Sequence, residues 1–137
     1  MSVKAFLDTN ILVYASLKSP DDQQKWQKAV DLLSSNCSFV VSTQVLNEFS
    51  VVLLRKKISD SDIRERMENI AADSIVTVVT LETIRHAWEL RKGYNLSYWD
   101  SLIVASAMQG GCATLYTEDM NHGIIIDLKL HIINPFK

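Results

Sequence analysis

Four acidic residues occupy places in the sequence where side chains from separate segments can meet. They are Asp8, Glu48, Asp100 and Asp119. Asp8 directly follows the apolar run at residues 3–7, and Asp119 comes soon after the run at residues 113–116. Ligands of α/β sheets bind beyond the carboxyl ends of the strands, so acids at those ends are candidates for function. Four carboxylates gathered there would repel one another unless divalent cations lay between them.

The ligand types narrow the chemistry of such a site. Hard oxygen ligands, with no trio of Cys or His nearby, favour Mg²⁺ or Mn²⁺ over zinc. These ions suit the cleavage of phosphodiester bonds, because the metal activates water and neutralises charge on the phosphate. We therefore predict a metal site built from the four acids, in an enzyme that cleaves phosphodiesters.

Each acid also has a structural alternative. Asp8 could cap the helix that follows it, and Asp119 could lie in a surface turn. Glu48 could rest its stem on the apolar neighbours of its helix and keep its carboxylate in water. Asp100 follows Ser97 at the spacing of a capping box, although Glu or Gln is the usual residue there. The sequence leaves these alternatives open.

The segments that must hold these acids alternate between strand-like and helical patterns. Strands are predicted at residues 3–7, 38–41, 75–79, 113–116 and 130–133. Helices are predicted at residues 23–33, 44–57, 61–72, 81–93 and 98–109, and a further helical face follows residue 10. We expect Asp60 to cap the third of these helices and Gly93 to end the fourth in the left-handed conformation. Because parallel neighbours need crossover connections, the fold class is a three-layer α/β structure with helices on both faces of the sheet.

Length and composition predict a single globular domain over residues 1–137, since 47% of the chain is apolar and 22% is charged. We expect neither a secretory leader nor a membrane span. Cys37 and Cys112 have neither zinc nor disulfide spacing, which is typical of a cytoplasmic protein. A net charge of −2 argues against a broad basic face. With two bound Mg²⁺ the charge becomes +2, which permits RNA binding.

Several short motifs, taken in order, resemble those of a known family. They are Leu7-Asp8-Thr9-Asn10, Asn47-Glu48, the run at residues 99–107, the run at residues 115–119 and the closing residues 133–136. Over nearly the whole chain they resemble a PIN-domain ribonuclease, most closely the small stand-alone toxins of VapC type. The resemblance implies a mainly parallel five-stranded sheet and an acidic pocket that holds Mg²⁺ or Mn²⁺ for endonucleolytic cleavage of RNA. It also implies a cognate antitoxin protein and a homodimer.

The resemblance assigns roles by position. Asp8, Asp100 and Asp119 match metal ligands, acting directly or through water, and Glu48 matches the fourth acid, which holds a metal or its water. Asn10 and Thr117 match polar positions that support Asp8 and the fourth acid. Glu118 stands beside Asp119, so the residues alone leave open which of the two faces the pocket. The family pattern of Thr, any residue, Asp favours Asp119.

Other residues have weaker claims to function. The cations at residues 55–57 are typical of a last helical turn, where they stabilise the helix dipole, with contact to RNA phosphates as the alternative. Arg85, Arg91 and Lys92 are expected on a solvated helix face. Tyr98 and Trp99 are the aromatics best placed to stack on a base, with packing in the core or in a dimer as the alternative.

Two other functions compete with the nuclease. A haloacid-dehalogenase-like phosphatase also begins with an acid after the first strand, but it needs a second aspartate where this chain has Asn10. A non-catalytic PIN-like module kept for binding a partner would be supported by the loss of site acids, and all four are present.

Overall fold

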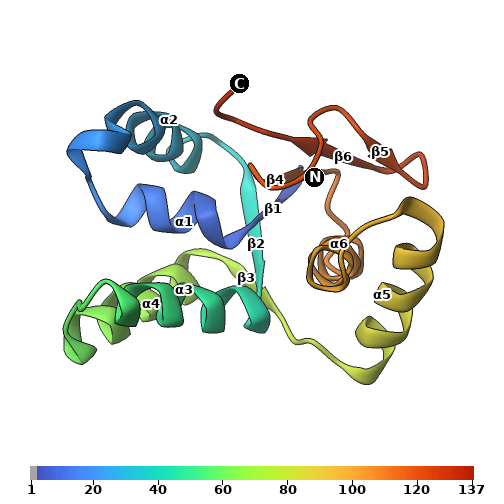
Figure 1. The fold of residues 1–137 in the computed structure, drawn as a ribbon, viewed down its shortest axis with the longest axis horizontal. Coiled ribbons are helices and arrows are strands. Elements are labelled where there is room, and N and C mark those ends of the chain that lie inside the picture. The colour runs from blue at the N-terminus through green and yellow to red at the C-terminus, as the bar shows by residue number, and fades with distance from the viewer. Residues whose placement is uncertain (1–2) are drawn as a thin grey trace.

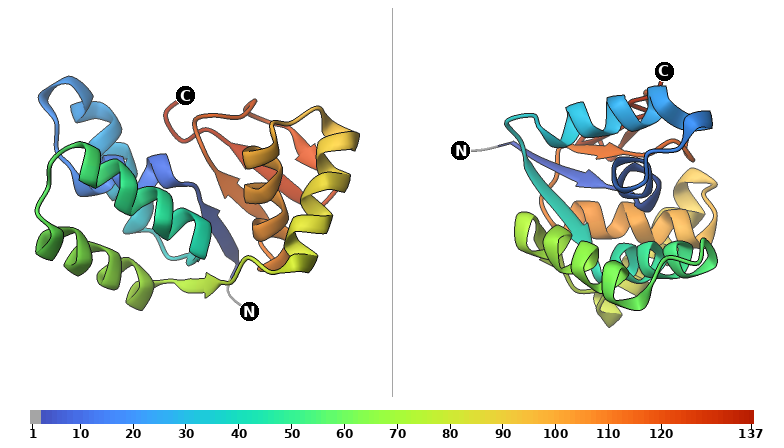
Figure 2. Two further views of the ribbon diagram at one scale, coloured as in Figure 1. Left: turned by 60° about the horizontal axis from the view of Figure 1, so that its bottom comes forward. Right: turned by 90° about the vertical axis from the view of Figure 1, so that its left-hand side faces the viewer.

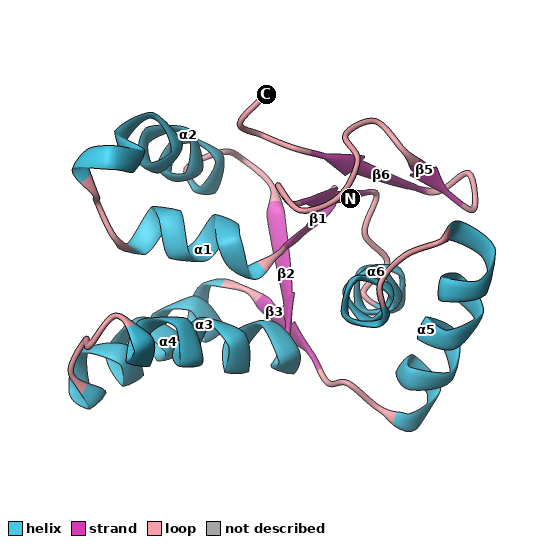
Figure 3. Ribbon diagram, in the orientation of Figure 1, coloured by secondary structure: helices cyan, strands magenta, loops and turns pink. Residues whose placement is uncertain are grey.

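The computed structural model describes residues 3–137, and in that part of the chain six strands form one sheet. The strands are β1 (Lys4–Leu7), β2 (Ser38–Ser42), β3 (Ile75–Thr77), β4 (Thr114–Tyr116), β5 (Ile125–Ile126) and β6 (Leu130–Ile133). Their order is β3-β2-β1-β4-β6-β5, and β5 alone pairs antiparallel. Figure 3 shows β5 and β6 together at one edge of the sheet.

Six α-helices connect these strands in the described residues 3–137. They are α1 (Thr9–Ser16), α2 (Gln23–Leu33), α3 (Thr43–Arg55), α4 (Asp60–Asp73), α5 (Leu81–Tyr94) and α6 (Tyr98–Gln109). A short 3₁₀ turn, Pro20–Asp22, precedes α2. Two of these helices, α2 and α6, have the predicted bounds. No helix in the described part of the chain has both the length and the apolar character that crossing a bilayer requires.

The direction of the crossovers explains the three layers. The chain moves from β1 to β2 to β3 in one direction along the sheet and then returns from β3 to β4 in the other. Right-handed crossovers therefore place α1–α4 on one face and α5 and α6 on the other, as Figure 1 shows. The left panel of Figure 2 shows the same division from another direction. The predicted α/β class is confirmed.

The strand prediction is confirmed for the five parallel strands, and the sheet has one strand more than predicted. The additional strand, β5, has only two residues, which is too short to carry a period-two pattern. Two helix ends also differ from the prediction. Ser59, rather than Asp60, caps α4, because its Oγ accepts the backbone N–H of Asp62 at 3.3 Å. Asn95, with a φ of +55°, supplies the left-handed residue predicted at Gly93, because α5 runs one residue further.

The centre of the sheet is the place where the topology brings the acids together. β1 lies between β2 and β4, and the helices that follow it and precede β4 lie on opposite faces. This is the switch point of an α/β sheet, where the loops beyond the strands part and leave room for a ligand. Leu7 of β1 pairs with Tyr116 of β4, and the N–H of Asp8 donates to the carbonyl of Tyr116 at 3.0 Å. Asp8 therefore enters the switch point level with the end of β4.

Helix α6 lies between the sheet and α5, in contact with both. Residues 101–107 are all buried, so the helix has no solvated face over two turns. Ser97 caps it through a hydrogen bond from the backbone N–H of Asp100 to the Ser97 Oγ, 3.1 Å long. The cap holds Asp100 in the first turn of a helix that is otherwise part of the core.

Candidate active site

Asp8 is a buried carboxylate at the end of β1, with only 5% of its surface exposed. Its Oδ1 accepts the backbone N–H of Thr9 at 2.7 Å, which caps α1, and its Oδ2 accepts the hydroxyl of Thr117 at 2.8 Å. Burial raises the pKa of Asp8 to about 6, although the hydrogen bonds from Thr117 and Thr9 oppose the shift, and the nearby charges of Asp119 and Glu48 add to it. Asp8 is thus both a helix cap and a buried acid with a raised pKa at the switch point.

Thr117 joins Asp8 to the loop after β4. It is fully buried, and its hydroxyl donates to Asp8 Oδ2 while its Oγ1 accepts the backbone N–H of Asp119 at 3.1 Å. One side chain therefore sets the positions of two acids that are more than 100 residues apart in the sequence. The structure brings Thr117 to Asp8, as the resemblance implies.

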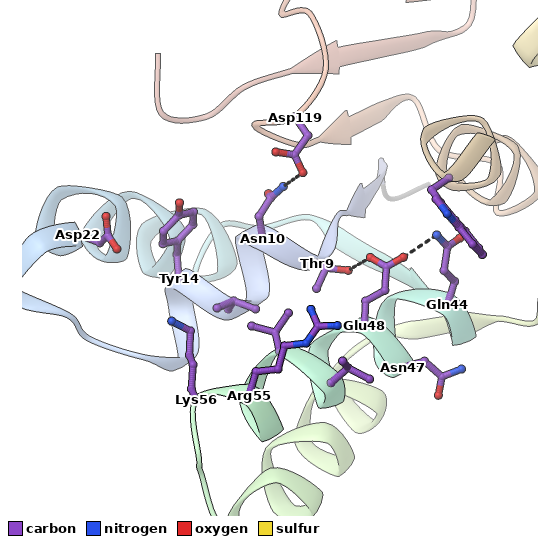
Figure 4. Close-up of a pocket in the computed structure, with 14 residues that line it drawn as sticks. Thr9, Asn10, Tyr14, Asp22, Gln44, Asn47, Glu48, Arg55, Lys56 and Asp119 are labelled. Carbon is purple, nitrogen blue, oxygen red and sulfur yellow. Dashed lines mark hydrogen bonds between the residues drawn. The ribbon is translucent and has the colours of Figure 1, made fainter. Parts of the chain in front are cut away.

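Asp119 and Glu118 point to different partners. Asn10 donates its amide N–H to Asp119 Oδ2 at 2.9 Å (Figure 4), and Asp119 lines a cavity of about 790 Å³. Glu118 instead accepts the Tyr14 hydroxyl at 2.7 Å and forms an ion pair with Lys25 at 2.8 Å. Asp119 is therefore the acid that borders the cavity, and Glu118 is the acid that ties its loop to α1 and α2.

Glu48 extends from α3 toward the same cavity. Its Oε2 accepts the hydroxyl of Thr9 at 3.0 Å and its Oε1 accepts the side-chain amide of Gln44 at 2.7 Å (Figure 4). Both carboxylate oxygens are held by neutral donors. The carboxylate is therefore fixed in place rather than left in bulk water.

Asp100 reaches the site from α6, on the other side of the sheet. Burial raises its pKa, an interaction with the Ser97 side chain lowers it, and the charges of Asp119 and Glu48 raise it. Asp100 does not itself line the cavity, whereas the neighbouring Trp99 does. Asp8 and Asp100 are thus each within electrostatic reach of Asp119 and Glu48, and of the four predicted acids Glu48 and Asp119 line the cavity.

The cavity has a volume of about 790 Å³ and lies between α1 and α3. Its polar wall contains the acids Asp22, Glu48 and Asp119, the amides Asn10, Gln44 and Asn47, and the cations Arg55 and Lys56. Arg55 and Lys56 were expected to stabilise the dipole of their helix, and the structure also brings them to the cavity. The signal was present in the spacing, because Arg55 stands seven residues after Glu48 and so shares its face of α3.

The donor set decides whether a metal fits this site. Within residues 3–137 no three His, Cys, Asp or Glu side chains are close enough to form a complete metal cage. The side-chain oxygens Oδ1 of Asn10 and Oε1 of Gln44, however, are buried without a hydrogen-bond partner in the described structure. Magnesium binds through one or two carboxylates and keeps several waters. Separated carboxylates with unpartnered oxygens beside them fit such an ion.

Comparison with known proteins identifies the family. The model of the PIN domain matches residues 5–123, which include all four acids. The chain belongs to the PIN-domain family. Membership of this family leaves the phosphatase alternative without support. No functionally curated protein matches this PIN domain.

Solved structures share the fold of this PIN domain at low sequence identity. VapC20 of Mycobacterium tuberculosis, a toxin that cleaves the sarcin–ricin loop, is 19% identical with a TM-score of 0.67, covering 84% of this chain and 91% of its own. A toxin–antitoxin complex from Klebsiella pneumoniae has a chain that is 18% identical with a TM-score of 0.70, with coverages of 96% and 97%. VapBC2 of Rickettsia felis, bound to a promoter DNA fragment, has a chain that is 22% identical with a TM-score of 0.62, with coverages of 96% and 100%.

Proposed function

We propose that this PIN domain is an endoribonuclease that depends on Mg²⁺ or Mn²⁺. The observation that carries the proposal is the linkage of Asp8 and Asp119 through Thr117, at the carboxyl ends of neighbouring strands and beside a cavity that contains both acids and cations. A buried acid with a raised pKa in such a place is typical of functional sites. The contrast is with Glu118, whose carboxylate is paired with Lys25.

In the proposed mechanism each acid has a role. Asp8, Asp100 and Asp119 would hold the metal directly or through water, and Glu48, oriented by Thr9 and Gln44, would hold a metal or its water. When bound, the metal activates water and neutralises charge on the phosphate. Arg55 and Lys56, at the same cavity, bind the phosphates of the RNA on either side of the scissile bond.

The direct test uses purified protein and an RNA that contains single-stranded loops. Cleavage should stop in EDTA and return when Mn²⁺ is added in excess. Asp8→Asn should lose cleavage and keep its fold, because the amide preserves volume and removes the charge that the metal needs. Asp73→Asn is the matched control, since Asp73 is an acid at the end of α4, away from the cavity. Undiminished cleavage in EDTA would refute the metal mechanism, and equal cleavage by both variants would show that Asp8 is wrongly assigned to the site.

We further propose that the protein is the toxin of a toxin–antitoxin pair, acts in the cytoplasm, forms a homodimer and is inhibited by a cognate antitoxin protein. The similar folds of VapC20 and of the Klebsiella and Rickettsia chains support this proposal. Expression in a bacterial host should arrest growth, and Asp8→Asn or a co-expressed antitoxin should relieve the arrest. Equal toxicity of wild type and Asp8→Asn would show that cleavage is not its cause.

A further inference from the structure

Three aromatic rings form a row that begins at the wall of the acidic cavity. Trp99 lines the cavity and is 64% exposed. Its ring lies 5.3 Å from the ring of Tyr98, at an angle of 71°, and Tyr98 lies 4.9 Å from Trp88 of α5, at 41°. Trp88 is 57% exposed. The row therefore crosses from α6 to α5 with a large exposed indole at each end.

A second, smaller cleft lies at the far end of the row. It has a volume of about 240 Å³ and is lined by Trp88, Arg91, Lys92, Asn95 and Leu96. Two of these described lining residues are cations and none is acidic, whereas three acids accompany the two cations of the first cavity. The row thus joins a site suited to metal ions to a cleft suited to anions.

The ordinary explanations account for only part of this arrangement. Arg91 and Lys92 lie in the last turn of α5, where positive charge stabilises the helix dipole, and Arg91 donates one N–H to the carbonyl of Leu96 at 2.8 Å. A guanidinium has five N–H donors, so four donors of Arg91 remain for another acceptor. Neither the helix dipole nor the Arg91–Leu96 hydrogen bond explains why two tryptophans have more than half of their surface in water. Exposed apolar surface of this kind marks interaction sites.

We propose that Trp99, Tyr98 and Trp88, with Arg91 and Lys92, form a binding subsite for single-stranded RNA that extends the active site. Unpaired bases stack on the two exposed indoles, and the phosphates that follow Trp88 lie against the two cations. Every base has a face that can stack, so such a row binds single strands with little sequence preference. The inference rests on the proposed ribonuclease function.

Charge favours RNA over a second copy of the chain as the occupant. Interfaces between proteins are enriched in Trp, Tyr and Arg but depleted of lysine at their centres, so Lys92 is the residue of the subsite that distinguishes the two occupants. Single-strand grooves combine such cations with aromatic platforms. The row also begins in the wall of the cavity where cleavage would take place. A strand bound along it would therefore enter the cavity next to the site acids.

The test measures binding without cleavage. The Asp8→Asn protein in EDTA is titrated against a labelled single-stranded RNA of about 12 nucleotides, a length within the range that stacking grooves cover, and binding is followed by fluorescence anisotropy. Adding Trp88→Ala or Trp99→Ala should weaken binding by about 5- to 150-fold, the range expected for one lost stacking partner. Trp26→Ala, at the third tryptophan of the chain on the opposite helical layer, should leave the affinity unchanged.

Two further measurements separate stacking and charge from a folding defect. Phe variants keep a ring for stacking but lack tryptophan emission. The Trp88→Phe/Trp99→Phe double variant should therefore still bind RNA, but without quenching of the remaining tryptophan emission. Trp26→Phe keeps Trp88 and Trp99 and should retain the quenching on RNA binding. The Arg91→Gln/Lys92→Gln double variant should reduce the slope of log affinity against log salt by about 1.4 between about 50 and 200 mM, because two phosphate contacts are lost.

The outcomes distinguish the subsite from the function on which it rests. If wild type cleaves RNA with Mn²⁺ but Trp88→Ala and Trp99→Ala bind as tightly as Trp26→Ala, the subsite is wrong and the nuclease stands. If wild type neither binds nor cleaves RNA, both proposals fall. If sedimentation shows that Trp88→Ala converts a dimer to a monomer while each protomer binds RNA as before, the row is an interface between copies and the subsite is overturned.

Discussion

Two neighbouring acids, Glu118 and Asp119, belong to regions with opposite electrostatic designs. Glu118 lies in a cluster with Tyr14 and Lys25, in which the carboxylate meets a cation that also lies 4.9 Å from the centre of the Tyr14 ring. Asp119 belongs to the acid cluster at the switch point, where the hydrogen bonds that hold the carboxylates come from amides, hydroxyls and a backbone N–H. The carboxylate of the first cluster is neutralised by Lys25, whereas the side chains that hold the carboxylates of the second cluster through these hydrogen bonds are all uncharged.

The comparison teaches how one loop can serve both stability and function. The Glu118 ion pair ties the loop after β4 to α2, and the next side chain along the chain is then turned to the cavity. If Asp119 serves function and Glu118 serves stability, substitutions at the acid cluster should mainly lower RNA cleavage. Substitutions in the Glu118 cluster should mainly lower the free energy of unfolding.

The largest expected difference between the clusters is in catalysis. Asp119→Asn should reduce RNA cleavage by more than about 100-fold, because even the outer partners of metal ligands change activity 10- to 100-fold. Glu118→Gln is the adjacent control and should remain within several-fold of wild type, since its hydrogen bond from Tyr14 can persist. Initial rates at saturating Mn²⁺ would measure both. A Glu118 variant as inactive as the Asp119 variant would remove the distinction between them.

The second difference concerns the pH dependence of stability without metal. The folded-state pKa of Asp8 is about 6 against 3.8 in the unfolded chain, so the folded protein holds a proton that the unfolded chain has released. The free energy of unfolding in EDTA should therefore fall by about 3 kcal/mol in total as pH rises from below 3.8 to above 6, with about 2 kcal/mol of the fall between pH 4 and pH 6.

Asp8→Asn should abolish this loss and unfold at a higher temperature than wild type at neutral pH in EDTA. Asparagine is also a good N-cap, so the cap of α1 is preserved. Glu118→Gln keeps the Asp8 carboxyl and should keep the pH dependence. If Asp8→Asn instead melted lower than wild type throughout, the carboxylate would serve α1 rather than a metal.

A smaller difference should appear on adding metal. Binding to the native state alone stabilises wild type by about 2.7 kcal/mol when Mg²⁺ is at 100 times its dissociation constant. Asp119→Asn should gain less, while Glu118→Gln should gain as much as wild type. Thermal melts over a series of Mg²⁺ concentrations would measure the gain. Identical gains in all three proteins would place the metal elsewhere.

The smallest expected effect is the loss of the ion pair itself. Lys25→Met should lower the free energy of unfolding by about 0.2–1 kcal/mol, since both partners are partly exposed and the pair is screened by solvent. The difference between variant and wild type should shrink in high salt. Urea unfolding at two salt concentrations would measure it, and an effect that did not depend on salt would point to lost packing of the Lys25 stem on Tyr14 and Phe136.

The parts of the fold that could be predicted are those with a local signal. The strand-like runs at residues 3–7 and 113–116 predict β1 and β4. Because ligands of α/β sheets bind beyond the carboxyl ends of strands, the acids that follow these runs are then the candidates for function. What Glu118 contacts could not be predicted, because Glu118 lies in a loop and its partner Lys25 lies 93 residues away on α2. The choice between Glu118 and Asp119 depends on this contact and so needed the three-dimensional structure.

The structural alternatives weighed for the acids prove compatible with a place in the site. Asp8 does cap α1 and Ser97 does cap α6 beside Asp100, yet the same carboxyls are near the other acids. A helix cap occupies only one of the two oxygens of a carboxylate, and no pattern in the sequence indicates the partner of the second oxygen. The second contact of Asp8, to Thr117, belongs to tertiary structure alone.

The burial of α6 has a consequence for motion. Asp100 belongs to a helix whose residues 101–107 have no solvated face, so its backbone amides should exchange with deuterium only when the whole domain unfolds. Asp119 is exposed and lies in a loop held by a few side-chain contacts, and its amide should exchange through local opening. The two sides of the acid cluster therefore differ in rigidity. A bound ion that bridged them would slow exchange in the Asp119 loop and leave α6 unchanged.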